Sequence, residues 1–217
     1  MTLEQYLQQE SDKRKYPWND MSQWTPEKVR TAWMRTGESL VKDYRDLHPE
    51  LTDDLIYYIL RDKRYSKDLD KGIAFLGVSG TGKTVQMKIL TLLIGFFHNK
   101  RPRPVMYSAK QMERILRLPS THEDVVKLWI DLANESGFVF DDMGKESERV
   151  KSMGTDIEIG IEVIEARYLE FINKGSLLFV TSNDNLTILE RKHGIHIVGR
   201  MKESMNIYPV KGEDQRV

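Results

Sequence analysis

One octapeptide has the residue types and spacing of a phosphate-binding loop. It fits the pattern G-x-x-x-x-G-K-[ST] and consists of Gly77, Val78, Ser79, Gly80, Thr81, Gly82, Lys83 and Thr84. Glycines let the backbone wrap closely around phosphate oxygens, so that successive N–H groups point toward the anion. We expect Lys83 to reach the terminal phosphates and the Thr84 hydroxyl to ligate Mg²⁺. The sequence therefore predicts a site for ATP with Mg²⁺.

Two acids follow an apolar segment farther along the chain. Residues 138–140 have the apolar character of a buried strand, and Asp141 and Asp142 come directly after them. In a parallel sheet, these carboxylates reach the same edge as the phosphate-binding loop. We expect Asp141 to hold Mg²⁺ through its water shell and Asp142 to orient or deprotonate the attacking water. An acidic turn after a strand is the simpler alternative, and the position downstream of the loop favours function.

A third apolar segment ends in small polar residues. Residues 178–180 are followed by Thr181, Ser182 and Asn183. Asn183 is expected to point at the γ-phosphate and its water if this strand lies between the strand before the loop and the strand before Asp141. Otherwise Asn183 is a turn residue of the kind that often ends strands. The strand order therefore decides its role.

From residue 69 to residue 217, predicted strands alternate with predicted helices. The strands are expected at 72–77, 104–108, 137–140, 176–181 and 205–210. This alternation predicts an α/β fold, a parallel sheet flanked by helices on both faces. Pro209 indicates that the last strand lies at an edge or ends there, because proline cannot donate to a strand ladder.

Two helix starts rest on side-chain capping. Ser108 with Gln111 predicts a helix after the second strand, and Thr155 with Glu158 predicts another before the fourth. The second of these helices is expected to end at Lys174. Its predicted apolar face consists of Ile161, Ile164, Tyr168 and Ile172.

Residues 1–68 are predicted to form a small helical region ahead of the core. Thr25 and Pro26 begin a helix that is expected to run to His48, and a second helix is expected to begin at Thr52. Leucine, tyrosine and tryptophan residues recur along the first helix at helical spacing.

Three of the four tryptophans lie in this region. Trp33 falls on the apolar stripe of the first helix and is predicted to be core. Trp18 and Trp24 fall outside the stripe and are candidates for contact with a partner, because aromatic side chains anchor interfaces well.

Composition limits the classes of function. The 217 residues include 33 Lys plus Arg and 33 Asp plus Glu, so a nucleic-acid site must be a local cluster. The absence of cysteine excludes disulfides and thiolate metal sites. The chain begins without the apolar segment of a secretory signal, and its most apolar run, 89–97, is too short to span a bilayer. We therefore expect a cytoplasmic protein that does not enter a membrane.

The three motifs in this order resemble those of AAA+ ATPases, and finer details resemble the DnaC/IstB group. Residues 141–144, Asp-Asp-Met-Gly, are similar to the acidic pair and glycine of that group. Arg167-Tyr168 ahead of residues 181–183 is similar to its "RY…TSN" arrangement. Residues 199–201 and 212–216 resemble its closing segments. The resemblance covers the chain from about Lys71 onward and implies an AAA+ core, a P-loop NTPase sheet.

The resemblance also implies roles for two arginines. Arg200 stands where the group places its arginine finger, which reaches the ATP of a neighbouring subunit, and loss of such a charge costs about 10³-fold or more in rate. Arg167 is the alternative residue for that role, or it forms a salt bridge within its own domain. Two departures are visible: no helical lid fits after the last strand, and Asp142 replaces the more usual glutamate. The adenine side of the site is therefore left undefined.

The leading hypothesis is an ATP-dependent helicase loader that acts in DNA replication. Its subunits are expected to assemble into a ring or spiral on single-stranded DNA and to contact the replicative helicase through residues 1–68. The polar segment 145–154, with Lys145, Arg149 and Lys151, is a candidate for tracking phosphates, although its mixed charge also fits a solvated loop. Alternatives are a transposition helper ATPase on target DNA, a small-molecule P-loop kinase, and an adaptor that binds ATP and rarely hydrolyses it.

Overall fold

The computed structural model describes residues 18–99, 103–117, 122–132, 137–147, 150–152 and 155–212, together with Gln5. The elements in chain order are α2 (Pro26–Leu40), α3 (Pro49–Leu60), β1 (Gly72–Leu76), α4 (Lys83–Phe97), β2 (Val105–Ser108), α5 (Ala109–Arg117), α6 (His122–Leu132), β3 (Phe138–Met143), β4 (Val150–Ser152), β5 (Thr155–Ile157), α7 (Ile159–Lys174), β6 (Leu178–Ser182), α8 (Leu186–His193), α9 (Ile195–Ser204) and β7 (Met205–Pro209).

Five of these strands form one parallel sheet in the order β2-β3-β6-β1-β7. All five were predicted from apolar runs, and β1 and β6 are buried along their whole length, as strands covered on both faces must be. The strand order places β6 between β1 and β3. This is the position of β6 that the prediction for Asn183, a residue directed at the γ-phosphate, requires. β7 lies at an edge, as Pro209 predicted.

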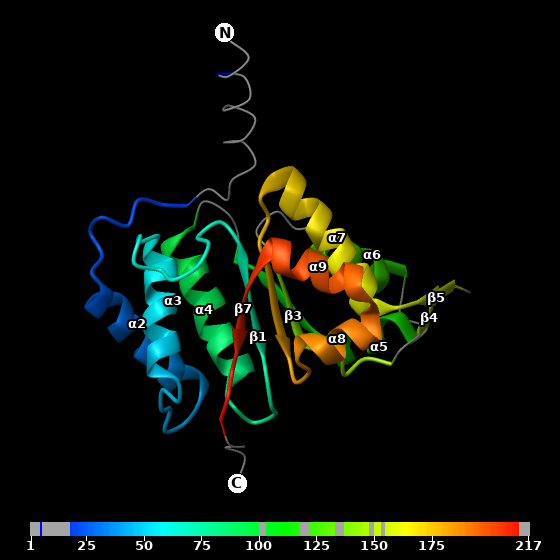
Figure 1. The fold of residues 1–217 in the computed structure, drawn as a ribbon, viewed down its shortest axis with the longest axis horizontal. Helices are drawn as coiled ribbons and strands as arrows, with labels where there is room; N and C mark the ends of the chain where they lie inside the picture. The colour runs from blue at the N-terminus through cyan, green and yellow to red at the C-terminus, as the bar shows by residue number, and fades with distance from the viewer. Residues whose placement is uncertain are drawn as a thin grey trace.

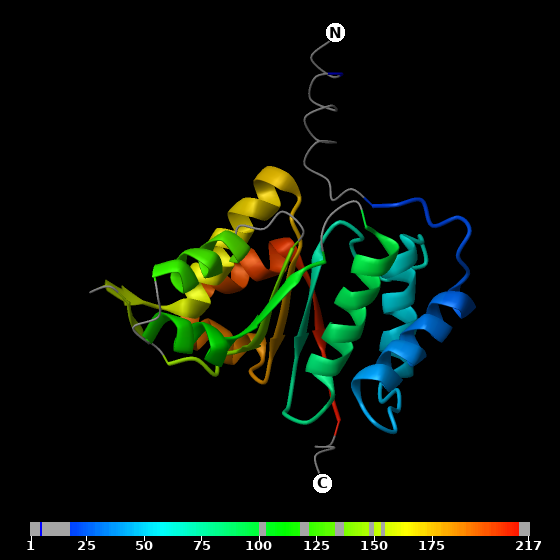
Figure 2. The same cartoon turned by 180° about the vertical axis from the view of Figure 1, so that it is seen from behind.

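Helices cover both faces of the sheet, so the fold has three layers. Figures 1 and 2 show α2, α3 and α4 on one side and α5 to α9 on the other. Successive residues of β1 alternate between the two cores: Ile73 and Phe75 pack under the first group of helices, and Ala74 and Leu76 under the second. The predicted α/β fold is confirmed.

The first helix begins as predicted but ends early. The Thr25 side chain accepts a hydrogen bond from the Lys28 N–H, and Pro26 occupies the first turn. The helix stops at Leu40 instead of continuing to His48, and the chain turns back so that the Tyr44 ring packs on the helix at Gly37. A Cβ atom at Gly37 would lie 2.4 Å from that ring. Residues 41–48 therefore form a connecting segment, and α3 begins at Pro49, ahead of the predicted start at Thr52.

The tryptophans of this region serve the protein's own core. Trp33 is fully buried, as predicted. Trp18 and Trp24 are partly buried, with both rings packed against the core beneath α2, α3 and α4, and their proposed partner role stays a prediction. The Trp18 ring meets the His98 ring edge-on at 4.6 Å, and the Trp24 ring meets Phe97 at 4.8 Å. Both contacts lie at the end of α4 that is farther from the phosphate-binding loop.

The residues before and within α7 differ from the prediction. Thr155 does not begin a helix: residues 155–157 form β5 and pair with β4 in an antiparallel hairpin. α7 begins at Ile159, and its buried face consists of Ile159, Gly160, Val163, Ile164 and Arg167. Of the predicted apolar face, Ile164 is fully buried, but Ile172 is exposed and a fully buried Arg167 occupies part of the inner face.

The predicted boundary at residue 68 stays a prediction. Within the described residues, α2 and α3 bury their apolar faces against α4 and share one hydrophobic cluster with β1 and β6. No helix in the described part of the chain is both long and apolar enough to cross a membrane.

Candidate nucleotide site

The phosphate-binding loop joins β1 to α4 at the carboxyl edge of the sheet. Three of its glycines have positive φ angles, 152° at Gly77 and 80° at Gly80 and Gly82. Gly77 also allows close packing, since a Cβ atom there would lie 2.0 Å from the Val210 carbonyl oxygen. Gly82 caps α4, so the first N–H groups of that helix face the loop and favour an anion.

Lys83 holds the centre of the loop. Its Nζ donates to the carbonyl oxygens of Gly77 at 2.9 Å and Val78 at 2.6 Å. It also donates to Asn183 Oδ1 at 3.1 Å, and only 5% of the residue is exposed. The structure therefore brings together two residues that are 100 positions apart in the sequence.

Thr84 and Asp141 meet beside this lysine. The Thr84 hydroxyl donates to Asp141 Oδ1 at 2.8 Å, and the Thr181 hydroxyl donates to the same oxygen at 2.5 Å. A hydroxyl and a carboxylate at the foot of a phosphate-binding loop are hard oxygen ligands of the kind that Mg²⁺ takes together with nucleotide phosphates. These residues fit a magnesium ion.

Asp142 lies in a β-bulge. The pairing of β3 with β6 gains one residue between Phe140 and Met143, and Asp142 has a φ of 60° in the left-handed region. Its N–H donates to the Thr181 hydroxyl at 2.9 Å. Because the bulge breaks the strand alternation, the two adjacent carboxylates both reach the site. Asp141 is buried against Thr84, and Asp142 lines the open cleft.

The cleft beside the loop has a volume of about 470 Å³. The phosphate-binding loop, Asp142, Lys145 and Asn183 form one side. The other side is formed by residues of the connecting segment between α2 and α3, which are Val41, Asp43, Tyr44, Arg45 and Leu47. Figure 1 shows this connection at the bottom of the molecule, where α4 also begins.

The sequence reasoning missed this second wall. The apolar spacing of residues 41–47 predicts a continued helix, and only contacts distant in sequence place them here. His48 Nε2 lies 3.0 Å from the Thr81 carbonyl oxygen of the phosphate-binding loop. The Tyr44 hydroxyl accepts a hydrogen bond from Trp33 Nε1 at 3.2 Å, and burial raises the pKa of Tyr44. The early end of α2 therefore supplies the side of the site that the motifs leave undefined.

Arg167 is a structural residue. It is fully buried, and its guanidinium donates to the carbonyl oxygens of Leu132, at 2.7 Å, and Leu177, at 3.2 Å. Leu132 ends α6, so this cation satisfies a carbonyl that the helix leaves without a partner. Burial lowers the pKa of Arg167 to about 10, which still leaves it charged at neutral pH. The alternative that it reaches a neighbouring subunit is wrong.

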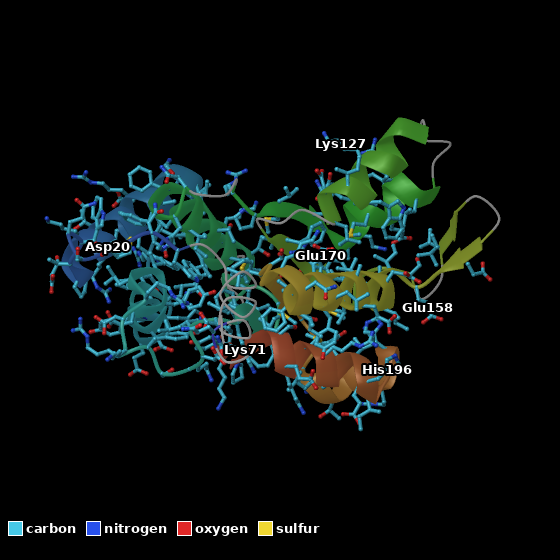
Figure 3. All side chains as sticks on the ribbon, turned by 90° about the horizontal axis from the view of Figure 1, so that it is seen from above. Asp20, Lys71, Lys127, Glu158, Glu170 and His196 are labelled. Carbon is cyan, nitrogen blue, oxygen red and sulfur yellow. The ribbon has the colours of Figure 1, made fainter. Side chains whose placement is uncertain are left out.

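Arg200 lies at the surface, outside the residues that line the cleft of its own chain. It forms an ion pair with Glu165, and its guanidinium carbon lies 5.5 Å from the centre of the Tyr168 ring. Figure 3 shows the two helices concerned, α7 and α9, side by side. The two adjacent residues of the Arg-Tyr pair thus lie on opposite sides of α7: the Arg167 side chain is buried, and the Tyr168 ring lies beneath Arg200.

Some predicted residues cannot be placed. In the polar segment 145–154, Arg149 and Gly154 lie outside the described residues, as do residues 213–216 of the closing segment. Lys145 is described and lines the cleft. Among the described residues, no group of three or more His, Asp or Glu side chains is arranged to hold a separate metal ion.

Three solved structures share this fold. The structure of the DnaC helicase loader matches with a TM-score of 0.56 and 18% identity, over 82% of this chain and 98% of the other. The structure of DnaI matches with a TM-score of 0.59 and 16% identity, over 86% of this chain and 93% of the other. The structure of a putative primosome component from Streptococcus pyogenes serotype M3 matches with a TM-score of 0.56 and 14% identity, over 85% of this chain and 91% of the other. No protein-family model and no curated protein matches the sequence. The predicted resemblance is confirmed as a fold, that of the DnaC-like AAA+ group.

Tyr44 offers a test of the second wall. We expect Tyr44→Ala to weaken ATP binding about fivefold to tenfold, because an aromatic contact contributes about 1 kcal/mol beyond the area it buries. Tyr57→Ala, which removes a comparable half-buried ring outside the cleft, should leave affinity within twofold. The measurement is a fluorescence titration with a labelled ATP analogue, with folding checked by circular dichroism. Equal affinities of the two variants would contradict a role for the segment in nucleotide binding.

Proposed function

We propose that this protein, which has the fold of the DnaC-like AAA+ group, is an ATP-dependent helicase loader that acts in DNA replication. It binds and hydrolyses ATP and loads or remodels a replicative helicase on single-stranded DNA in the cytoplasm. The observation that carries this proposal is that Lys83 meets Asn183, and Thr84 meets Asp141, at one edge of the sheet. The fold that positions them is similar to that of the solved DnaC helicase loader.

Each residue of the site has a role that derives from its position. The loop N–H groups and Lys83 bind the β- and γ-phosphates, and Thr84 and Asp141 hold the ion. Bound Mg²⁺ neutralises negative charge on the phosphates. Asp142 faces the open cleft and orients or deprotonates the attacking water, while Asn183 fixes the γ-phosphate side of that water.

Arg200 completes the site from a neighbouring subunit. It lies outside the cleft of its own chain, yet Glu165 and Tyr168 hold its guanidinium at the surface. Arg167 cannot take this role, because it is buried. We infer that subunits associate head to tail, so that Arg200 of one faces the γ-phosphate held by the next, which produces a ring or a spiral.

A mixing experiment tests the shared site. Lys83→Ala should abolish ATP binding, and Arg200→Ala should lower hydrolysis about 10³-fold. An equal mixture should regain about a quarter of the wild-type rate, because one in four head-to-tail interfaces then pairs an intact loop with an intact arginine. Arg191→Ala, which removes an exposed arginine of α8, is the control and should keep the wild-type rate. Co-assembly without recovered hydrolysis would contradict the trans role of Arg200.

The partner is tested by affinity capture. The bait is the Asp142→Asn variant, expected to bind ATP without hydrolysing it, in an extract of the protein's own cells. The matched truncation removes residues 1–17 only, because removal of residues 1–68 would also take away α2 and α3, which complete the hydrophobic core. We expect mass spectrometry to identify the replicative helicase with the full chain and not with the truncation. Recovery of a transposase, or of duplex DNA without helicase, would favour a transposition helper ATPase instead.

A further inference from the structure

Lys145 contacts the residue that faces the attacking water. Its Nζ lies 2.9 Å from Asp142 Oδ2, and both side chains line the cleft. The side chains are 41% and 31% exposed, so the pair is reachable from solvent and is held by its own charges. Of the cationic residues that line the cleft, Lys83 contacts the loop, whereas Lys145 contacts the carboxylate.

The loop that carries Lys145 is fixed by two helices. At its start, the Gly144 carbonyl oxygen accepts a hydrogen bond from Lys192 Nζ of α8 at 3.0 Å, and the Gly144 N–H donates to Glu146 Oε2 at 2.7 Å. At its end, the Ser147 hydroxyl donates to Glu113 of α5 at 2.7 Å. These contacts hold residues 143–147 in the conformation that brings the lysine onto Asp142.

Glu113 is buried and has three hydrogen-bond donors. The carboxylate receives Lys110 at 2.8 Å as well as both the hydroxyl and the N–H of Ser147. These donors lower the pKa of Glu113 to about 2, so it remains an acceptor throughout the neutral range. Ser147 is therefore the fixed point between the Lys145 loop and the β4–β5 hairpin.

The β4–β5 hairpin rests on the same helix as the Lys145 loop. Figure 3 shows its two strands projecting from the body of the protein beyond Glu158. Val150 at its base is buried against α5, the helix that also holds Ser147 through Glu113. A displacement of the hairpin on α5 would therefore also disturb the helix that holds Ser147.

We propose that Lys145 is a positioning residue that restrains Asp142, and that movement of residues 143–147 with the β4–β5 hairpin releases it. The inference rests on the proposed function, since Asp142 must act on water. The ammonium group occupies one carboxylate oxygen of Asp142 and holds it toward the cation, so that this oxygen is not directed at an attacking water. Because a partly exposed ion pair is weak, the restraint slows hydrolysis without abolishing it, and a binding event at the hairpin is enough to lift it.

The first test compares three variants by steady-state hydrolysis and by ATP affinity. Lys145→Met should raise kcat about twofold to fivefold, the range expected for a partly exposed ion pair, with the Kd for ATP unchanged within twofold. Lys145→Arg, which keeps the charge, should behave as the wild type. Lys174→Met is the matched control: it removes a lysine that is 43% exposed and pairs with Glu170 at 3.0 Å on α7, and it should change neither quantity.

Glu113→Gln tests the link to the hairpin. It weakens the hold on Ser147 and should also raise kcat. In the Lys145→Met background it should add nothing, because the restraint is then already absent. Independent, multiplying effects of the two substitutions would overturn the link between the hairpin and the restraint. Circular dichroism confirms that each variant is folded.

The possible failures can be told apart. A kcat that is unchanged or lower in Lys145→Met, with the wild type active, would overturn the inference and leave the proposed function intact. A Kd for ATP weakened tenfold or more would show that Lys145 binds phosphate instead and would also overturn it. Absence of hydrolysis in every protein, despite ATP binding, would overturn the proposed hydrolytic function together with this inference.

Discussion

The position of β6 between β1 and β3 is the constraint on which the rest of the site depends. Parallel strands direct their carboxyl ends to one edge, so this order brings Asn183 next to Lys83 and Asp141 next to Thr84. The Thr181 hydroxyl in β6 then forms hydrogen bonds with two residues of β3: it donates to the carboxylate of Asp141 and accepts from the N–H of Asp142. With another strand order, the same residues would end their strands without meeting one another.

The helical region that precedes the sheet belongs to the site as well as to the core. Its connecting segment forms one wall of the cleft, and His48 contacts the backbone of the phosphate-binding loop at Thr81. The same region runs to the other end of α4, where the Asn19 N–H donates to His98 Nδ1 at 3.1 Å. The helical layer thus extends from the wall of the cleft at one end of α4 to the contacts of Trp18 and Trp24 at the other.

Features determined by neighbours in sequence could be predicted. The glycine and lysine spacing of the loop, the five apolar strands and the Ser108–Gln111 cap, observed as reciprocal hydrogen bonds of 2.8 and 3.2 Å, all depend on residues a few positions apart. The phosphate loop, the two acids and Asn183 were therefore located correctly at one edge. Their chemical roles remain proposals.

Features determined by distant contacts could not be predicted. α2 ends at Leu40 because the Tyr44 ring packs on Gly37, and the helical spacing of Tyr44 and Leu47 gave no sign of this turn. Arg167 can be buried because the carbonyl oxygens of Leu132 and Leu177 accept hydrogen bonds from its guanidinium, which a pattern of apolar residues cannot show. The pairing of Lys145 with Asp142 likewise depends on a bulge that no spacing rule identifies.

We propose that Lys83, Thr84 and Asp141 form one site for ATP and magnesium. Isothermal titration calorimetry of the protein with ATP, in magnesium and then in EDTA, tests it most directly. We expect saturable binding to one site per chain in magnesium, with an affinity weakened about tenfold or more by EDTA and by Asp141→Ala. Binding with the same affinity in all three conditions would contradict it.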